Sequence, residues 1–203
     1  MPISQQLGCI FVHIPRTGGT SVETALGVLS DARVENTSLM FGRVTSPSLK
    51  SRALSTDFLQ HLTASELRDL LGEEFNNYFR FAFVRNPWER MVSIYFYHRK
   101  VTGEIASFPE FLKRAEGHRK NHLVPQHEFV FDKDGNRLVD FVGRFERMPD
   151  DFSKVCAALK IERELPHLNA ATIGDYRSYY DDAARRIIER VYGEDIERFS
   201  YVF

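Results

Sequence analysis

The sequence predicts an α/β protein built around a mainly parallel central sheet. Residues 8–14 (GCIFVHI) and 78–84 (YFRFAFV) are nearly continuous apolar runs. Such runs are typical of strands that are covered on both faces. Each run is followed within a few residues by a segment with helical spacing. Repeated strand–turn–helix units favour a parallel sheet with helices packed on it.

The composition fits one soluble domain. The 203 residues match the usual size of a single domain, and 43% of them are hydrophobic. A formal net charge of −1 argues against a nucleic-acid partner. No apolar run reaches transmembrane length and no signal peptide is visible, so we expect a cytoplasmic protein. Cys9 and Cys156 are expected to be buried free thiols.

The first half of the chain contains one strong unit and one irregular stretch. After the loop PRTGG, the segment from Thr20 places Val22, Ala25, Leu26 and Leu29 at helical spacing. Residues 30–56 are polar and lack a period, which indicates a variable insertion within a single domain spanning 1–203. Residues 57–62 (DFLQHL) are interpreted as a short strand. Thr63 and Glu66 then form a capping box that opens a helix ending near Leu71.

The second half repeats the pattern. Asn86 is a good N-cap and Pro87 suits the first helical position, so a long helix should follow the second strand. Helices are also expected over 107–116, 150–159 and 180–192. Residues 128–142 (EFVFDKDGNRLVDFV) indicate a β-hairpin around the turn DKDGN. Residues 167–176 (HLNAATIGDY) indicate a polar loop.

The turn after the first strand, PRTGGTS at 15–21, has the composition of an anion site. Glycines allow a close backbone approach, and the N–H groups at the start of the next helix favour negative charge. Arg16 adds a positive charge, and hydroxyl donors come from Thr17, Thr20 and Ser21. The simpler alternative is a tight turn with Thr20 as N-cap. A nucleotide-hydrolase loop of the form GxxxxGK(S/T) is absent, since Thr20 and Ser21 follow Gly19.

The turn after the second strand also suits a phosphate. Arg85 stands at the carboxyl end of the strand, where α/β proteins bind ligands, and Ser93 lies two turns into the next helix. Arginine binds phosphate in a bidentate manner. The alternative is that Arg85 pairs with a carboxylate and Ser93 packs in the core.

Together the two motifs resemble those of the sulfotransferases that use 3′-phosphoadenosine 5′-phosphosulfate (PAPS), especially the carbohydrate sulfotransferase branch and its short bacterial relatives. Later stretches (PQHEFVF, VDFVGRFE, HLNAA) are also similar. The resemblance implies a P-loop-NTPase-like three-layer α/β/α fold and transfer of a sulfuryl group to a hydroxyl, with 3′-phosphoadenosine 5′-phosphate (PAP) as product. It assigns the 3′-phosphate to Arg85 and Ser93, and the 5′-phosphosulfate to Arg16, Thr17, Gly18, Gly19, Thr20 and Ser21.

One departure from the family concerns Arg16, which stands where the family usually has lysine. Arginine keeps the charge but replaces a compact ammonium with a planar fork that does not give up its proton. We expect Arg16 to stabilise the leaving phosphate oxygen. A sulfuryl group carries one negative charge rather than the two of a phosphoryl group, so no metal is expected in the reaction.

The acceptor hydroxyl needs a base, and the sequence offers seven histidines. His61 matches the place of the catalytic histidine in the carbohydrate branch, and a neutral imidazole suits this role. The alternative is that His61 packs at a helix start. His13 is interpreted as a core or pocket-wall residue, while Gln126 and His127 are assigned to the acceptor side.

Two other classes of function remain as alternatives at this point. One is a P-loop-like nucleotide or phosphate kinase, which the missing lysine disfavours. The other is a non-catalytic module that binds a nucleotide. The expected partner is a carbohydrate or another hydroxyl-bearing acceptor, and no motif specifies which one or an oligomeric state.

Overall fold

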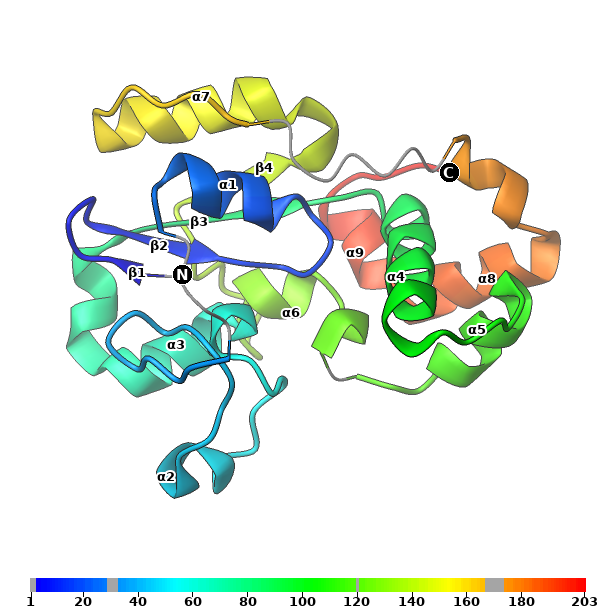
Figure 1. Cartoon of the computed structure of the whole chain (residues 1–203). Coiled ribbons are helices and arrows are strands. Elements are labelled where there is room, and N and C mark those ends of the chain that lie inside the picture. Colours follow the sequence, from blue (N-terminus) through cyan, green and yellow to red (C-terminus); the bar gives the residue numbers. More distant parts are fainter. Residues whose placement is uncertain (1–2, 29–32, 120, 167–173) are drawn as a thin grey trace.

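The computed structural model describes residues 3–28, 33–119, 121–166 and 174–203. A four-stranded sheet lies in the middle, with α1 (Gly19–Ala25) and α7 (Met148–Leu159) on one face and α3 (Ala64–Leu71) and α6 (His127–Val130) on the other (Figure 1). Within these residues, no helix combines the length and the apolar character needed to cross a membrane.

The sheet has the order β1-β2-β3-β4. The central pairs are parallel: β2 (Cys9–Val12) with β3 (Phe79–Val84), and β3 with β4 (Phe141–Arg144). The short β1 (Ile3–Ser4), which the sequence pattern did not predict, adds to the edge of β2 in the antiparallel sense. The predicted α/β class with a mainly parallel sheet is therefore confirmed.

Alternate residues of each strand point into two separate hydrophobic cores. Phe11 of β2 and Phe81 of β3 pack with residues of α1 and α7. Ile10 and Ala82, on the opposite face, pack with the larger group of helices that follows β2 and β3. This period of two explains why the strands are apolar throughout: both faces are covered.

The remaining helices all pack with the larger of the two cores. They are α2 (Pro47–Lys50), α4 (Pro87–Thr102), α5 (Phe108–Ala115), α8 (Asp182–Val191) and α9 (Gly193–Arg198). Short 3₁₀ turns occur at Leu59–His61, Gly72–Asn77, Asn121–Leu123, Phe145–Arg147 and Tyr176–Tyr179. The predicted helices near 107–116, 150–159 and 180–192 are thus present, whereas α9 was not anticipated.

The helix starts predicted from capping residues are confirmed. The side chain of Asn86 accepts hydrogen bonds from the backbone N–H groups of Trp88 (3.0 Å) and Glu89 (3.3 Å). Thr63 and Glu66 form the reciprocal capping box. In both cases a side chain satisfies backbone donors that have no partner inside the helix.

The strand predicted over 57–62 is wrong. Residues Leu59–His61 form a 3₁₀ turn instead. Leu59 and Leu62 are both buried in the core. Side chains three positions apart share a face in a helical turn but point to opposite faces in a strand, so burial of both residues selects the turn.

The hairpin predicted over 128–142 is also wrong, although its turn exists. Asp132 accepts hydrogen bonds from the N–H groups of Asp134 and Asn136, and a single antiparallel bridge joins residues 131 and 137. The first arm is α6, because adjacent Phe129 and Val130 are both buried and a half-exposed strand would expose one of them. The second arm runs into β4, which pairs with β3.

The segment 30–56 carries more structure than a polar loop. Its described part contains α2 and a bridge between residues 36 and 41, and it buries Met40, Phe41 and Leu49 in the cores. In the predicted polar loop 167–176, residues 167–173 lie outside the described residues. Cys9 and Cys156 are free and buried, as expected, and burial raises the pKa of the Cys9 thiol to about 12.

Candidate active site

The two turns identified in the sequence meet at the carboxyl edge of β2 and β3. Arg16, in the turn after β2, donates from its Nε to the hydroxyl of Ser93 on α4 at 3.0 Å. Arg85, which follows β3, donates from one guanidinium nitrogen to the backbone carbonyl of Arg16 at 3.3 Å. Arg16, Arg85 and Ser93 are far apart in the chain but therefore lie together in the fold.

The paired glycines have structural roles in the turn. Gly18 caps α1 with φ +83°, a left-handed conformation that glycine adopts without strain. Gly19 lies directly against the imidazole of His13: a Cβ atom at Gly19 would stand 2.0 Å from its Nε2. The N-cap is thus Gly18, where the simpler alternative had placed Thr20.

The hydroxyl groups of this turn differ in exposure. Thr17 is fully buried and donates to the carbonyl of Ile14 at 2.9 Å, which closes the turn. Ser21 is buried, and Thr20 is exposed on the first turn of α1. Of the three hydroxyl residues assigned to a 5′ phosphate group, only Thr20 faces solvent.

Arg16 is held in an uncommon conformation. Its φ of +69° lies in the left-handed region, which non-glycine residues seldom adopt. Its guanidinium stands over the ring of Tyr97, 5.0 Å from the ring centre. Burial, together with the positive charge of Arg85, lowers the pKa of Arg16. The site therefore concentrates positive charge in a place sheltered from water.

Arg85 is buried and held from several sides. Its guanidinium pairs with Glu89 at 2.9 Å and stands 4.0 Å from the ring centre of Phe145. Its Nε is buried and has no hydrogen-bond partner among the described residues. The alternative that Arg85 pairs with a carboxylate is thus correct in part, but this contact leaves one donor unused.

The carboxamide of Gln126 fixes the backbone of Arg85. It accepts from the Arg85 N–H and donates to the Arg85 carbonyl, both at 2.8 Å, and Gln126 is fully buried. The carboxamide is thus engaged at both its oxygen and its nitrogen, and it is shielded from solvent. Gln126, which the sequence assigned to the acceptor side, therefore positions Arg85 in this structure.

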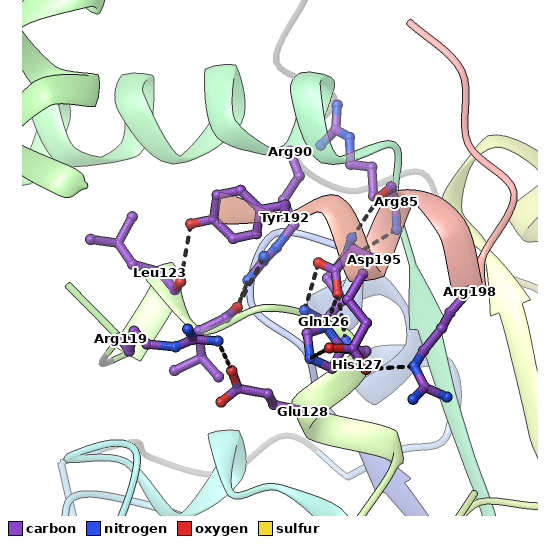
Figure 2. A network of polar contacts seen from close by, with 12 residues as sticks. Arg85, Arg90, Arg119, Leu123, Gln126, His127, Glu128, Tyr192, Asp195 and Arg198 are labelled. Atoms are coloured by element: carbon purple, nitrogen blue, oxygen red, sulfur yellow. Dashed lines mark hydrogen bonds and ion pairs between the residues drawn. The ribbon is translucent and has the colours of Figure 1, made fainter. Parts of the chain in front are cut away.

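Asp195 of α9 organises the neighbouring residues (Figure 2). Its carboxylate accepts from the N–H of Gln126 at 2.8 Å, from the N–H of His127 at 2.7 Å, and lies 2.6 Å from His127 Nδ1. The other ring nitrogen of His127 is 3.2 Å from Glu194. Both nitrogens of His127 thus face carboxylates rather than an open pocket. No sequence motif pointed to Asp195.

Arg90, which the sequence did not single out, joins three segments of the site. It is 2% exposed and donates to the carbonyls of Pro15 (3.0 Å), His122 (2.9 Å) and Val124 (3.2 and 3.1 Å). Figure 2 shows it beside the same network. It is the second arginine of the RNPWER stretch, five residues after Arg85, and this repeated arginine was the available signal.

His61 has a defined tautomer. Its Nδ1 lies 3.0 Å from the backbone carbonyl oxygen of His13. A carbonyl only accepts, so Nδ1 carries the proton and Nε2 is left with a lone pair. Burial, and then the neighbouring His13, lowers the pKa of His61 well below its ordinary value. The imidazole is therefore neutral at pH 7, with its lone pair on Nε2.

Two more histidines stand beside His61. His13 lies 4.6 Å away and His122 lies 5.9 Å away between ring centres. His13 bonds to Glu23 at 2.8 Å, and this partner holds the pKa of Glu23 at about 2 although burial alone would raise it. Burial and the charges of Arg90 and Arg16 lower the pKa of His122 to about 4. His13 is thus a buried histidine with its own partner, which agrees with the core interpretation.

Comparisons with known proteins define the class of protein. The model of the sulfotransferase family matches residues 2–202, so the chain belongs to the sulfotransferase family. An uncharacterized protein of Archaeoglobus fulgidus is 31% identical over 118 residues, which cover 55% of this chain and 93% of that protein. The crystal structure of mouse sulfotransferase SULT7A1 complexed with PAP superposes with a TM-score of 0.58 at 16% identity, covering 92% of this chain and 83% of that one.

Proposed function

We propose that this protein transfers a sulfuryl group from PAPS to an acceptor hydroxyl, with a carbohydrate as the acceptor class. The convergence of Arg16, Arg85 and Ser93 carries the proposal. It places two guanidinium groups and a hydroxyl at one strand edge, as a donor with separate 5′ and 3′ phosphate groups requires. The PAP in the mouse SULT7A1 structure supports the same class of nucleotide.

The residues present fit such a donor. Arg16 and Arg85 lie close enough that the charge of Arg85 lowers the pKa of Arg16, so the two cations repel one another. A bound phosphate offsets this repulsion, and the unused Nε of Arg85 supplies a further donor. Ser93 is 2% exposed beneath the guanidinium of Arg16, so its hydroxyl becomes available when Arg16 turns toward the 5′ side.

In this proposal Arg16 and His61 have different catalytic roles. Arg16 stabilises the negative charge that develops on the leaving phosphate oxygen, and its effect is larger in the transition state than in the ground state. His61 accepts the proton of the acceptor hydroxyl at Nε2, while the carbonyl of His13 holds the ring in this tautomer. Arg90 and Gln126 hold the two turns in position: Arg90 donates to the carbonyl of Pro15, and Gln126 accepts from the N–H of Arg85.

The test is calorimetric binding of PAP and AMP, with EDTA present throughout. We expect PAP to bind much more tightly than AMP. Arg85→Ala and Ser93→Ala should weaken PAP binding, by roughly ten- to a hundredfold for Arg85→Ala, because a charge-assisted hydrogen bond is lost. AMP binding should barely change. Arg99→Ala, an exposed arginine on the same helix, is the matched control.

Two results would contradict the proposal. Equal losses for PAP and AMP in Arg85→Ala would show that Arg85 does not bind the 3′-phosphate. Preferential binding of ATP, with turnover that EDTA abolishes and Mg²⁺ restores, would indicate a kinase instead.

A further inference from the structure

A second concentration of arginines lies away from the donor turns. A cavity of about 240 Å³ opens beside the ends of β3 and β4, next to α9. Three arginines and no acidic residue line it. The lining consists of Arg137, Arg144, Arg198, Phe131, Phe199, Ser200, Val84 and Val142.

The lining of this cavity includes none of the residues assigned to the donor turns, although Val84 directly precedes Arg85. Val84 and Val142 pack with the larger core, on the side of α6 and α9. Phe145, which contacts Arg85 and borders Gly18, packs with the core formed by α1 and α7. The arginine cavity is therefore not part of the proposed PAPS site.

Aromatic contacts hold two of the guanidinium groups in place. Arg198 stands 4.4 Å above the ring of Phe131, and Arg144 stands 4.7 Å above the ring of Tyr201. Arg144 also donates to the backbone carbonyl of Phe199. Stacking and a single backbone bond fix a guanidinium without using all its donors. These two groups are pre-organised for a ligand.

The charge of the cavity is only partly balanced by the protein. Arg198 pairs through its Nε with Glu194 at 2.7 Å. Arg137 makes no side-chain hydrogen bond or ion pair with the described residues, although Asp140 is close enough for its carboxyl to feel the Arg137 charge. Three neighbouring guanidinium groups around one space repel each other, and an anion would relieve this repulsion.

Ser200 adds a polar residue to the lining. It follows α9 with φ +51°, in the left-handed conformation of a common helix end, and the N–H groups of Ser200 and Tyr201 bond to the carbonyls of Glu197 and Ile196. The cavity thus combines three cationic forks and a hydroxyl with two phenyl rings.

From these features we infer that the cavity binds a small ring compound carrying an oxyanion group, namely a sulfate, phosphate or carboxylate. The guanidinium groups bind the oxyanion in a bidentate manner, and the phenyl groups of Phe131 and Phe199 that line the cavity contact the ring. A volume of about 240 Å³ limits the ligand to about one ring with its substituents. The inference is independent of the proposed function, since it uses none of the donor-site residues.

The experiment is a titration of the ¹⁵N-labelled protein, followed by NMR at low ionic strength, where exposed charges are least screened. The probes are phenyl phosphate, phenyl sulfate and benzoate, and phenol is the uncharged control. We expect saturable shifts at the amides of Ser200 and Arg144 with the three anions and none there with phenol. Shifts at Gly18 and Gly19 report the donor turns separately.

Variants assign the binding to the arginines. Arg144→Ala and Arg198→Ala should weaken the anion affinity by roughly ten- to a hundredfold, and Arg137→Gln by about three- to tenfold. Arg137→Gln breaks no side-chain bond seen among the described residues, so it tests the site even if Arg144→Ala fails to fold. Arg190→Ala, an exposed arginine on α8 paired with Glu116, should change nothing. Absence of saturable shifts at Ser200, or unchanged affinity in Arg137→Gln, would overturn the inference.

Discussion

Among single residues, the two glycines of the first turn have structural roles that do not depend on a bound ligand. Gly18 provides the left-handed N-cap of α1, and Gly19 leaves space for the imidazole of His13. The sequence predicted that these glycines allow a close backbone approach to a bound anion, and this stays a prediction. The approaching group that the structure reveals is a side chain from the preceding strand, and no local pattern encodes that contact.

Gly19→Ala should therefore destabilise the protein. The added methyl group would lie 2.0 Å from His13 Nε2, so the histidine or the turn must move. We expect a loss of about 1–3 kcal/mol in the free energy of unfolding, the usual cost of overpacking. Urea denaturation measures it. Gly193→Ala is the matched control, since a Cβ there meets nothing within 4 Å, and an unchanged stability of Gly19→Ala would contradict the account.

At the scale of elements, local chemistry decides which predictions succeed. Helices that were predicted from a capping residue begin where expected, because the capping hydrogen bond joins residues within one helical turn. The short strand at 57–62 and the hairpin at 128–142 failed because tertiary burial selected between helix and strand in short apolar runs. The convergence of Arg16, Arg85 and Ser93 could be predicted from the paired motifs, because each motif follows one of two neighbouring parallel strands. Asp195 and the role of Gln126 depend on α9 docking from the far end of the chain.

The capping box of α3 offers a test at this scale. Glu66 accepts from the backbone N–H of Thr63 at 2.7 Å and also from the backbone N–H of Ser55 at 2.6 Å, so the box ties the end of the 30–56 segment to α3. Thr63→Ala should lower the free energy of unfolding by about 0.5–2 kcal/mol. Thermal and urea denaturation check this. Thr102→Ala, which removes an exposed hydroxyl at the end of α4, is the control; equal effects would contradict a capping role.

At the scale of the whole molecule, burial of neutral histidines links stability to pH. His61 and His122 have lowered pKa values in the folded state, the latter about 4. The unfolded chain takes up these protons near pH 6.5, whereas the folded protein does not. The contribution of the two neutral histidines to the free energy of unfolding is thus fully present above pH 6.5, and it is lost as the pH falls below 6.5. The slope is about 1.4 kcal/mol per pH unit for each histidine.

Urea denaturation between pH 7 and pH 5 measures this linkage. The free energy of unfolding should fall toward pH 5, and His122→Asn should reduce the slope by the share of one histidine. His118→Asn replaces an exposed histidine and should leave the slope unchanged. A slope that His122→Asn does not alter would show that His122 takes up its proton equally in both states.

The proposed mechanism combines an electrostatic residue, Arg16, with a neutral base, His61, in one site. Single-turnover transfer from labelled PAPS to a sugar acceptor tests it most directly, with donor affinity measured in parallel. His61→Ala should slow transfer by roughly 10²–10⁴-fold with nearly unchanged donor affinity, since the base touches only the acceptor proton. Arg16→Ala should slow every acceptor, water included, by about 10²–10³-fold, whereas Arg16→Lys should keep substantial activity. Near-normal transfer by a folded His61→Ala protein that still binds PAP would contradict the account.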